Sequence, residues 1–450
     1  GKLGYWNLYG RLLNEGPYAA VEARMDLLEP TGTSTDVWTS VHTKIEGGSV
    51  GNATENNGSL ADLRMSQLYV QAGNILLEDV TWQFGTLDTY FGTLGLYDMW
   101  PARIFLETVG ASGRLKKGPV EVLLGFGDSG FNLKSGKYNT ILTFGGTLRI
   151  SAGKHVEFGL GGQYLFEPSA MGNINAPYQT PNIDYEDFIR GEVVESWVEA
   201  NPDREDFFPE PEAQNASSFK AIGYVGFGGF GPIRWNSLYV NFLREHPQMS
   251  YTESYAGNDY EIYIEGLTDS RYQFNLGNEL QMGLIPRKLD LAWGLVYGNY
   301  WDIDNTISPT DYDRVFLSSV LRFQLYLNPT VHLLAEGSAA REHSTQGNRY
   351  REHADSIFAN STGMPDTEGL EEGDSDTRHT FQGKVGWVLN PLGPGIFVRP
   401  SLRLLYGFQY SNQNNAFGNN FVDTLDQFNE FGNVERHWHH VLALETEVWF

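Results

Sequence analysis

A regular alternation of apolar and polar residues recurs along the whole chain and constrains the fold more than any other feature. In residues 397–408, for example, Leu402 and Leu404 alternate with Arg399 and Arg403. Successive side chains of a β-strand point to opposite faces, so a period of two predicts strands with one apolar and one polar face. We predict an all-β fold of eighteen strands, at residues 4–13, 17–28, 36–46, 64–73, 79–86, 102–114, 118–127, 139–151, 154–166, 218–229, 234–245, 270–282, 286–298, 314–328, 331–342, 379–389, 396–409 and 437–450.

The connections between these strands alternate in length. Most on one side are tight turns, such as 116–118 and 328–330, and most on the other are long and polar, such as 343–378. Short turns at one rim and long loops at the other are the pattern of an antiparallel outer-membrane β-barrel, whose short turns face the periplasm. We therefore predict a single transmembrane barrel domain over residues 1–450, located in the bacterial outer membrane. The link Asn14-Glu15-Gly16 is the exception, because it is short on the long-loop side.

Composition excludes several other classes of protein. The formal net charge of −25 disfavours a nucleic-acid partner, and the absence of cysteine excludes disulfides and cysteine-based metal sites. No apolar run approaches the roughly 18–20 residues that a transmembrane helix needs, so a membrane location rests on β-structure. A soluble two-sheet sandwich stays open as an alternative, because it also has short alternating strands. A solenoid is disfavoured, because no fixed repeat is present.

The chain ends in an amphipathic strand that closes on two aromatic residues. Residues 441–450 read Val-Leu-Ala-Leu-Glu-Thr-Glu-Val-Trp-Phe. By the alternation, Phe450 faces lipid together with Leu442 and Leu444, whereas Trp449 faces the lumen. A terminal strand that ends on an aromatic residue resembles the assembly signal of bacterial outer-membrane barrels.

Aromatic and charged residues on the polar faces indicate which solute the lumen would pass. A sugar presents an apolar face of C–H bonds that packs on an aromatic ring, and hydroxyls that need hydrogen-bond donors and acceptors. The predicted lumen aromatics are Tyr9, Trp100, Phe397 and Trp449, and the predicted lumen ionic groups are Arg11, Glu22, Arg24, Arg64, Asp98, Arg399 and Arg403. For each residue alone, a purely structural role at the rim stays open. Together the two sets favour a sugar channel.

Four short stretches resemble the maltoporin family of eighteen-stranded, trimeric carbohydrate porins. They are Tyr9-Gly10-Arg11, the run from Arg64 to Trp100, the stretch Ile396-Phe397-Val398-Arg399-Pro400, and the end Glu447-Val448-Trp449-Phe450. The resemblance implies a homotrimer, an inward-folded third loop at residues 87–101, and an aromatic slide beside a polar track for maltodextrin-like substrates. It assigns Tyr9, Phe397 and Trp449 to the slide, places Trp100 at the constriction, and assigns Arg11, Glu22, Arg64 and Asp98 to the track. Arg399 and Arg403, ionic groups of the lumen by their alternation, complete the predicted track.

The chain departs from the family pattern at several positions. The first external loop is reduced to a tight turn, the slide aromatic of the second strand aligns with Ala20, and a track arginine aligns with Phe91. Residues 47–63 contain no aromatic that a neighbouring subunit could insert. These departures make passage of sugars or oligosaccharides in general the expected function, rather than passage of maltodextrin alone.

We therefore expect passive, saturable diffusion of sugars across outer-membrane lipid, with no cofactor. A general diffusion porin, with ion selectivity set by the lumen charges, is the first alternative. An outer-membrane enzyme is another, although no G-x-S-x-G, H-E-x-x-H or P-loop motif is present. Asp302 and Asp304 are a candidate calcium site that lacks the calcium-loop glycine and terminal Glu, so a solvated acidic loop is its alternative. The acidic stretch 167–217 is expected to be a long extracellular loop, either flexible or a lid that repels anions.

Overall fold

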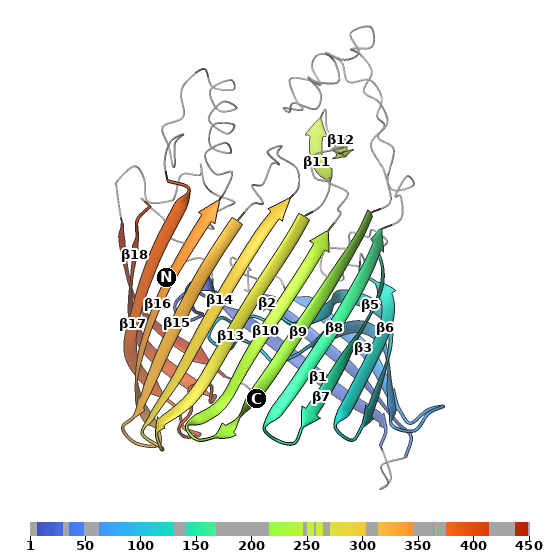
Figure 1. The fold of residues 1–450 in the computed structure, drawn as a ribbon, viewed down its shortest axis with the longest axis horizontal. Helices are drawn as coiled ribbons and strands as arrows, with labels where there is room; N and C mark the ends of the chain where they lie inside the picture. Colours follow the sequence, from blue (N-terminus) through green and yellow to red (C-terminus); the bar gives the residue numbers. More distant parts are fainter. Residues whose placement is uncertain are drawn as a thin grey trace.

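The computed structural model describes residues 7–29, 36–48, 63–129, 141–167, 216–245, 250–255, 258–263, 271–302, 314–344, 363, 375–413 and 437–448. These residues form an antiparallel sheet of seventeen strands and a separate two-stranded hairpin (Figure 1). The strands of the sheet are β1 (Tyr18–Leu28), β2 (Trp38–Gly48), β3 (Arg64–Gly73), β4 (Val80–Tyr90), β5 (Arg103–Lys117), β6 (Val120–Asp128), β7 (Leu142–Ala152), β8 (Val156–Glu167), β9 (Ala216–Phe230), β10 (Ile233–Glu245), β13 (Arg271–Ile285), β14 (Leu289–Asp302), β15 (Arg314–Tyr326), β16 (Val331–Ser344), β17 (Thr377–Leu389), β18 (Ser401–Ser411) and β19 (Trp438–Glu447). The hairpin consists of β11 (Ser250–Tyr255) and β12 (Asn258–Tyr263), and a short 3-10 helix, η1 (Asn7–Tyr9), precedes β1.

Each strand of the sheet pairs antiparallel with the next strand of the sheet along the chain. Successive connections therefore alternate between two rims. Turns at residues 118–119, 153–155, 231–232 and 286–288 join the strands at one rim, whereas the longer connection 91–102 starts from the other. Gly118 and Gly153 take positive φ angles of 58° and 68° in two of these turns, a conformation that suits glycine. The all-β antiparallel architecture predicted from the alternation is confirmed.

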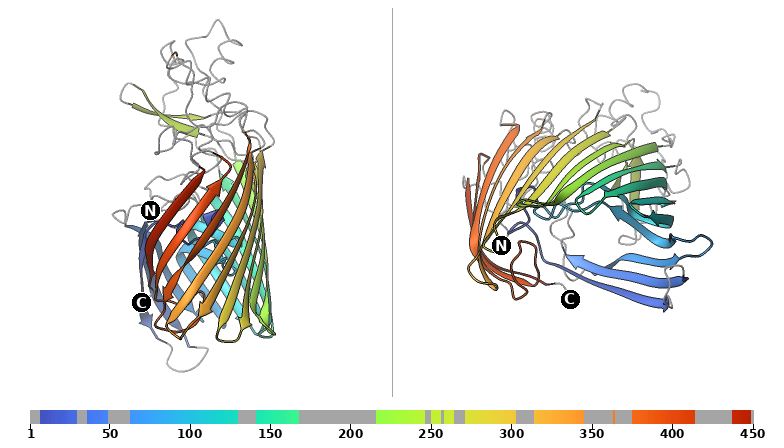
Figure 2. Two further views of the ribbon diagram at one scale, coloured as in Figure 1. Left: turned by 90° about the vertical axis from the view of Figure 1, so that its left-hand side faces the viewer. Right: turned by 60° about the horizontal axis from the view of Figure 1, so that its bottom comes forward.

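The first and last strands, β1 and β19, are the two edges of the sheet. Because every pairing is antiparallel and the strands number seventeen, β1 and β19 run in the same direction. The described residues form no ladder between them, and Figure 2 shows the blue strands at the start of the chain facing the red strands at its end across an opening. Every residue of β1 is exposed. We call this opening between β1 and β19 the seam.

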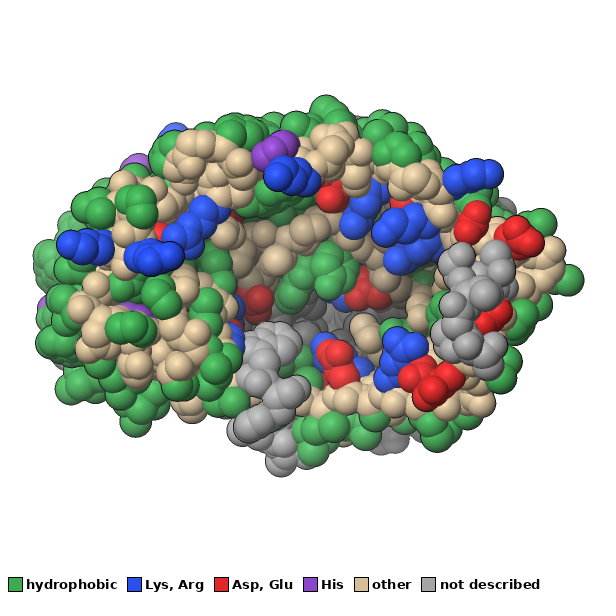
Figure 3. Space-filling model, turned by 90° about the horizontal axis from the view of Figure 1, so that it is seen from below, with side chains coloured by type: hydrophobic (Ala, Val, Ile, Leu, Met, Phe, Trp, Pro, Cys, Tyr) green, Lys and Arg blue, Asp and Glu red, His purple; other side chains and the backbone are tan. Residues whose placement is uncertain are grey.

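The two faces of the sheet differ as the alternation predicts. On β18, Leu402, Leu404 and Tyr406 are exposed, whereas Arg403 and Leu405 between them are buried. Figure 3 shows apolar side chains around the outside of the ring and charged side chains of both signs around a hollow. An apolar outer band around a polar interior is the arrangement of a transmembrane β-barrel, in agreement with the predicted outer-membrane location. Among the described residues, no helix is long and apolar enough to cross a bilayer.

Two of the predicted strands differ from the structure: one is replaced by a short helix and a turn, and one begins later than predicted. Residues 7–13, predicted to belong to a strand at 4–13, form η1 and a following turn instead. The strand predicted at 396–409 begins only at Ser401, so Phe397 and Arg399 lie in the turn before β18. Pro400 has no N–H group to donate to a ladder, which explains why pairing starts after it. The β11–β12 hairpin lies within the connection 246–269, where we predicted no strand.

Candidate functional site: the luminal constriction

Residues 7–15, which we call the plug, lie in the lumen against the wall that β15 to β19 form. Leu8, Tyr9, Leu12 and Leu13 are each at most 4 % exposed. Leu8 and Tyr9 belong to a cluster of buried apolar residues with Phe316 and Val320 of β15, and Leu12 and Leu13 to a second cluster with Leu334, Val388, Leu405 and Val441. The inner face of the wall therefore contains an apolar patch that the plug covers. Burial on this patch explains why residues 7–13 do not extend the sheet.

Hydrogen bonds from the wall fix the backbone of the plug. Lys384 Nζ donates to the Tyr9 carbonyl oxygen at 3.0 Å, and Ser318 Oγ donates to the Leu8 carbonyl oxygen. The Tyr9 hydroxyl donates to the Glu342 carboxylate. At the other end of the plug, the Leu13 N–H donates to Glu445 Oε1 of β19 at 2.7 Å. The backbone of the plug is thus hydrogen-bonded to three strands, β15, β17 and β19, and the Tyr9 side chain is hydrogen-bonded to a fourth, β16.

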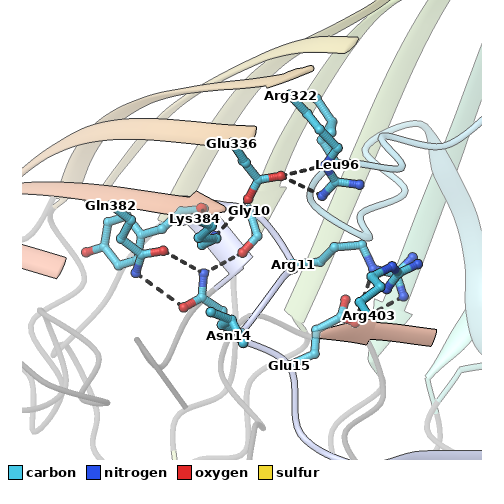
Figure 4. Close-up of polar contacts among 12 residues, drawn as sticks. Gly10, Arg11, Asn14, Glu15, Leu96, Arg322, Glu336, Gln382, Lys384 and Arg403 are labelled. Carbon is cyan, nitrogen blue, oxygen red and sulfur yellow. Dashed lines mark hydrogen bonds and ion pairs between the residues drawn. The ribbon is translucent and has the colours of Figure 1, made fainter. Parts of the chain in front are cut away.

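Asn14 and Gln382 join the plug to β17 through their side chains. Asn14 Nδ2 donates both to the Gly10 carbonyl oxygen within the plug and, at 3.0 Å, to Gln382 Oε1. Gln382 Nε2 in turn donates to Gln409 Oε1 of β18 at 2.7 Å. Figure 4 shows the Asn14 amide between Gly10 and Gln382. Because Asn14 is fully buried, each of these bonds replaces one to water and holds the turn after η1 closed.

Two groups of buried charges lie in the wall beneath the plug. Glu336 of β16 accepts from Arg322 at 2.6 Å and from Lys384 at 2.8 Å (Figure 4). Glu342, on the same strand, accepts from Arg314 at 2.6 Å and from Arg378 at 2.8 Å. Each group is a carboxylate between two cations, and all six side chains are at most 6 % exposed. The β-sheet register brings these charges together, because Arg322, Glu336 and Lys384 are direct partners across β15, β16 and β17.

The connection between β4 and β5, residues 91–102, also folds into the lumen. Leu94, Leu96 and Tyr97 are fully buried in it. The Leu96 N–H donates to Glu279 of β13 at 2.8 Å, and the Leu96 carbonyl oxygen accepts from the Arg11 N–H of the plug at 2.8 Å. This confirms the inward-folded loop predicted at residues 87–101. The loop and the plug are in direct contact, so together they narrow the lumen.

Glycines in the wall make room for this inward loop. A Cβ atom on Gly277 of β13 would lie 2.8 Å from Leu94 Cδ1, and one on Gly294 of β14 would lie 2.6 Å from Tyr97 Cε2. Either distance is too short for a real contact, so a larger residue at either position would push the loop away from the wall. The Tyr97 hydroxyl also reaches Ser318 of β15, 3.3 Å from its carbonyl oxygen. The loop therefore crosses the lumen from β4 to the opposite wall.

A third group of charges lies in the lumen beside the plug, and all of its members except the buried Arg403 are partly exposed. Glu447 of β19 lies 3.3 Å from Arg11, 2.5 Å from Arg399 and 2.7 Å from Arg403. Arg11 also pairs with Glu15 at 3.0 Å, and Arg403 lies 3.8 Å from Glu445. We call Arg11, Glu15, Arg399, Arg403, Glu445 and Glu447 the Glu447 cluster. Its donors and acceptors alternate in space, so it can exchange hydrogen bonds with a passing polar solute.

The titration of Glu15, which lies in the plug outside the strands, is perturbed. Burial raises the pKa of Glu15 from its ordinary value of 4.5 to about 7, and the nearby Asp98 and Glu447 carboxylates add to that rise. The Arg11 guanidinium opposes it. Glu15 therefore changes charge near neutral pH while the plug is in place.

Four of the six residues predicted for the polar track come together here. Arg11, Arg399 and Arg403 belong to the Glu447 cluster, and Asp98 lies close enough to raise the pKa of Glu15. The remaining two lie elsewhere. Glu22 is exposed on β1, 3.5 Å from Lys44, and Arg64 is exposed at the start of β3. Arg24, a further predicted lumen charge, pairs with Asp26 of its own strand at 2.7 Å.

The predicted slide aromatics do not form one continuous row among the described residues. Tyr9 is a residue of the plug and is buried against the wall, and Phe397 packs against the same apolar cluster. Trp100 lies apart from them, with its ring 6.3 Å from that of Tyr90 and with the Arg103 guanidinium 5.8 Å away. Trp449 is outside the described residues. The roles in sugar binding that we predicted for these four residues stay predictions.

Sequence reasoning missed the six buried charges of the wall. The signal was present, because charged and polar residues recur at every second position of β17, as in Arg378, Thr380, Gln382 and Lys384. Alternation alone does not predict the register between neighbouring strands, and it is this register that places three charged residues side by side. It also does not show that another part of the chain covers them.

The described residues hold no group of three His, Asp or Glu side chains that could bind a metal ion. Of the candidate calcium ligands, Asp302 ends β14 and its side chain lies outside the described part of the chain, as does Asp304. The acidic stretch 168–215 is also outside it. The calcium site and the extracellular lid therefore stay predictions.

No family model and no curated protein matches the chain. Solved structures to which it has a distant likeness include the outer-membrane channel DcaP of Acinetobacter baumannii, at 10 % identity over 73 % of this chain and 92 % of that one, with a TM-score of 0.36. OccK10 (OpdN) of Pseudomonas aeruginosa is 9 % identical over 88 % and 93 %, with a TM-score of 0.38. An anion-selective porin from Comamonas acidovorans is 10 % identical over 82 % and 88 %, with a TM-score of 0.37. At these values the likeness supports no statement about the substrate or the selectivity of this chain.

Proposed function

We propose that this chain is an outer-membrane porin through which sugars or oligosaccharides diffuse passively. The Glu447 cluster is the observation that carries the proposal. It presents guanidinium donors and carboxylate acceptors side by side, partly exposed, where the plug and the inward loop narrow the lumen. A sugar hydroxyl both donates and accepts, so it can replace water at such a cluster without leaving a charge unpaired. Release requires weak binding, of the order of millimolar affinity or about −4 kcal/mol.

Planar-bilayer recordings test this function directly. The purified protein is expected to conduct ions, and an oligosaccharide added to one side is expected to reduce the current in a saturable manner. Trp100→Ala should weaken that block, because this half-buried ring in the inward loop offers a face on which a sugar can stack. Trp387→Ala is the matched control, since Trp387 is 50 % exposed on the outer face of β17. Ion conduction with no block by any oligosaccharide would reject the sugar specificity.

A general diffusion porin is the second candidate, and one observation favours it. Tyr9 and Phe397 pack in an apolar cluster and do not line an open path as consecutive stacking surfaces. In that case the passage of ions would depend on the lumen charges, and small neutral solutes would pass according to size alone. Liposome swelling with sugars and amino acids of equal size separates the two candidates, because only the sugar porin prefers the sugar.

The predicted homotrimer forms part of the proposal and is tested separately. Chemical cross-linking of the detergent-extracted protein is expected to give a ladder that ends at three chains. If cross-linking gives only the single chain, the predicted trimer is rejected, and the proposed channel function is unaffected.

A further inference from the structure

The plug directly precedes β1, one of the two strands that border the seam. A bilayer contains no water to bind unpaired backbone N–H and C=O groups, so the edges of β1 and β19 need a partner. Since β1 and β19 run in the same direction, a single strand antiparallel to both would fit between them. The plug is joined to β1 by residues 16–17 alone. It is therefore the segment best placed to supply that strand.

The residue pattern of the plug suits a strand as well as its luminal position. Leu8 and Leu12 are buried against the wall in the lumen. On a strand they would share one face, and that face would meet lipid, while Tyr9 and Arg11 would face the lumen. Burial of a leucine stabilises it relative to exposure to water, and lipid supplies an apolar environment as the wall does. Leaving the lumen therefore does not expose these leucines to water.

We propose that residues 7–15 have two positions: docked in the lumen as the plug, and released, with residues 7–13 as a strand that pairs with β1 at the seam. The inference rests on the proposed porin function, because it concerns the opening of the same lumen. In the docked position the plug narrows the channel. In the released position the same residues complete the wall, and the channel widens.

Release also changes which charges the lumen presents. The docked plug contacts Lys384 and Glu342 through hydrogen bonds with Tyr9, and Gly10 lies against Glu336. The two groups to which these side chains belong hold four cations and two anions, which become more accessible when the plug leaves. An excess of fixed positive charge on a channel wall raises the local concentration of anions. The released channel is therefore expected to conduct more current and to prefer anions more strongly than the docked one.

A reversible cross-link tests whether the plug moves. The chain has no cysteine, so paired substitutions label cleanly. Asn14→Cys with Gln382→Cys places one thiol on the plug and one on β17, where the native side chains are in hydrogen-bond contact at 3.0 Å. Bridging them with a short bifunctional thiol reagent should hold single-channel records at the lower conductance level, and reduction should restore switching to the higher level. Gln71→Cys with Gln83→Cys, across β3 and β4 with the same 3.0 Å contact, is the matched control and should not change the record.

A substitution at Gly10 displaces the equilibrium in the opposite direction. A Cβ atom on Gly10 would lie 3.0 Å from Glu336 Oε1 and 3.2 Å from Val320 Cγ1, and its φ of +85° disfavours any other residue. Gly10→Val therefore opposes docking, whereas valine favours a strand. We expect a severalfold longer residence at the higher level and a reversal potential shifted towards anions. Gly118→Val, at a φ of +58° in open space, is the control for backbone strain without a clash and should behave as the wild type.

A second cysteine pair tests the released position. With Asn14 to Pro17 as a four-residue turn, Arg11 comes opposite Ala20 of β1. Arg11→Cys with Ala20→Cys should therefore form a disulfide that holds the channel at the higher level. Identical records with and without the Asn14–Gln382 bridge, or failure of the Arg11–Ala20 pair to cross-link in the membrane, would overturn the proposal. No conduction by any variant would instead reject the porin function itself.

Discussion

The Tyr9 hydroxyl donates a hydrogen bond to the Glu342 carboxylate, 333 positions further along the chain. Glu342 also forms ion pairs with Arg314 and Arg378, so one carboxylate joins the plug to two further strands of the wall. Burial raises the pKa of the Tyr9 phenol, which keeps it protonated and therefore a donor. Glu342 thus both anchors the plug and pairs with buried cations of the wall.

Removing the Tyr9 hydroxyl is expected to weaken this anchor without changing its packing. Tyr9→Phe deletes one hydrogen bond to a charged acceptor, which should lower the free energy of unfolding by about 1.5–3 kcal/mol. Denaturant unfolding in detergent measures the loss. Tyr164→Phe is the control, because Tyr164 is 49 % exposed on β8, and its effect should stay within about 0.5 kcal/mol. Equal losses in both variants would show that the Tyr9 bond contributes nothing.

Neutralising Glu336 is expected to be among the most destabilising single changes in the wall. Glu336→Gln leaves Arg322 and Lys384 buried without a counter-charge, which should cost about 3–5 kcal/mol. Glu121→Gln is the matched control, since Glu121 lies 3.8 Å from an Arg114 that is 42 % exposed, and such a pair contributes about 0–1 kcal/mol. The same denaturant titration ranks the two variants. A Glu336→Gln protein as stable as Glu121→Gln would contradict the buried-charge assignment.

The raised pKa of Glu15 predicts a pH dependence for the docked plug. With a pKa of about 7 when docked and 4.5 when free, Glu15 takes up a proton on docking. Docking is therefore strongest at low pH and weakens as the pH rises through the interval between these two values. The unfolding free energy of the wild type should fall relative to that of Glu15→Gln over that interval and run parallel to it above. A constant difference across the whole range would mean that the pKa of Glu15 does not change on docking.

Charge changes in the Glu447 cluster are expected to alter ion selectivity. Glu447→Gln removes the carboxylate that faces Arg11, Arg399 and Arg403, so the cluster gains net positive charge. The reversal potential under a salt gradient should shift towards anions, and Arg403→Gln should shift it towards cations. Glu22→Gln, on a side chain that is 67 % exposed on β1, should have a smaller effect. Shifts of the same sign in Glu447→Gln and Arg403→Gln would exclude a selectivity role for the cluster.

Alternation of residue type predicted most of the fold because a strand exposes its two faces to different surroundings. β18 shows this well, since Leu402 and Leu404 face outward and Arg403 faces inward as their spacing requires. The inward loop at 91–102 also agrees with the prediction, and the resemblance to a family with such a loop was the reason for expecting it. The start of β18 was predicted too early, because the alternation continues through Pro400 although proline cannot donate to the ladder.

The first segment was predicted wrongly for a different physical reason. Leu8 and Leu12 are compatible with a lipid-facing strand, but they are equally compatible with burial on Val320 and Leu334 inside the lumen. Local sequence does not distinguish the two, because the deciding partners lie on strands more than three hundred residues away. The role of Lys384 and Glu336 could not be predicted for the same reason. Lys384 pairs with Glu336 and also binds the Tyr9 carbonyl oxygen of the plug, which is far away in the sequence.

The separation between the plug and its partners also determines when it can dock. The contacts of Leu8 with Ser318, of Asn14 with Gln382 and of Tyr9 with Lys384 span 310, 368 and 375 positions. Contacts between residues so far apart form late, because the chain entropy of closing the loop is lost before the contact stabilises anything. The plug can therefore dock only after the last strands are in place. Docking of the plug therefore marks the completion of assembly, so a half-built channel would be distinguishable from a finished one by the solvent exposure of residues 7–15.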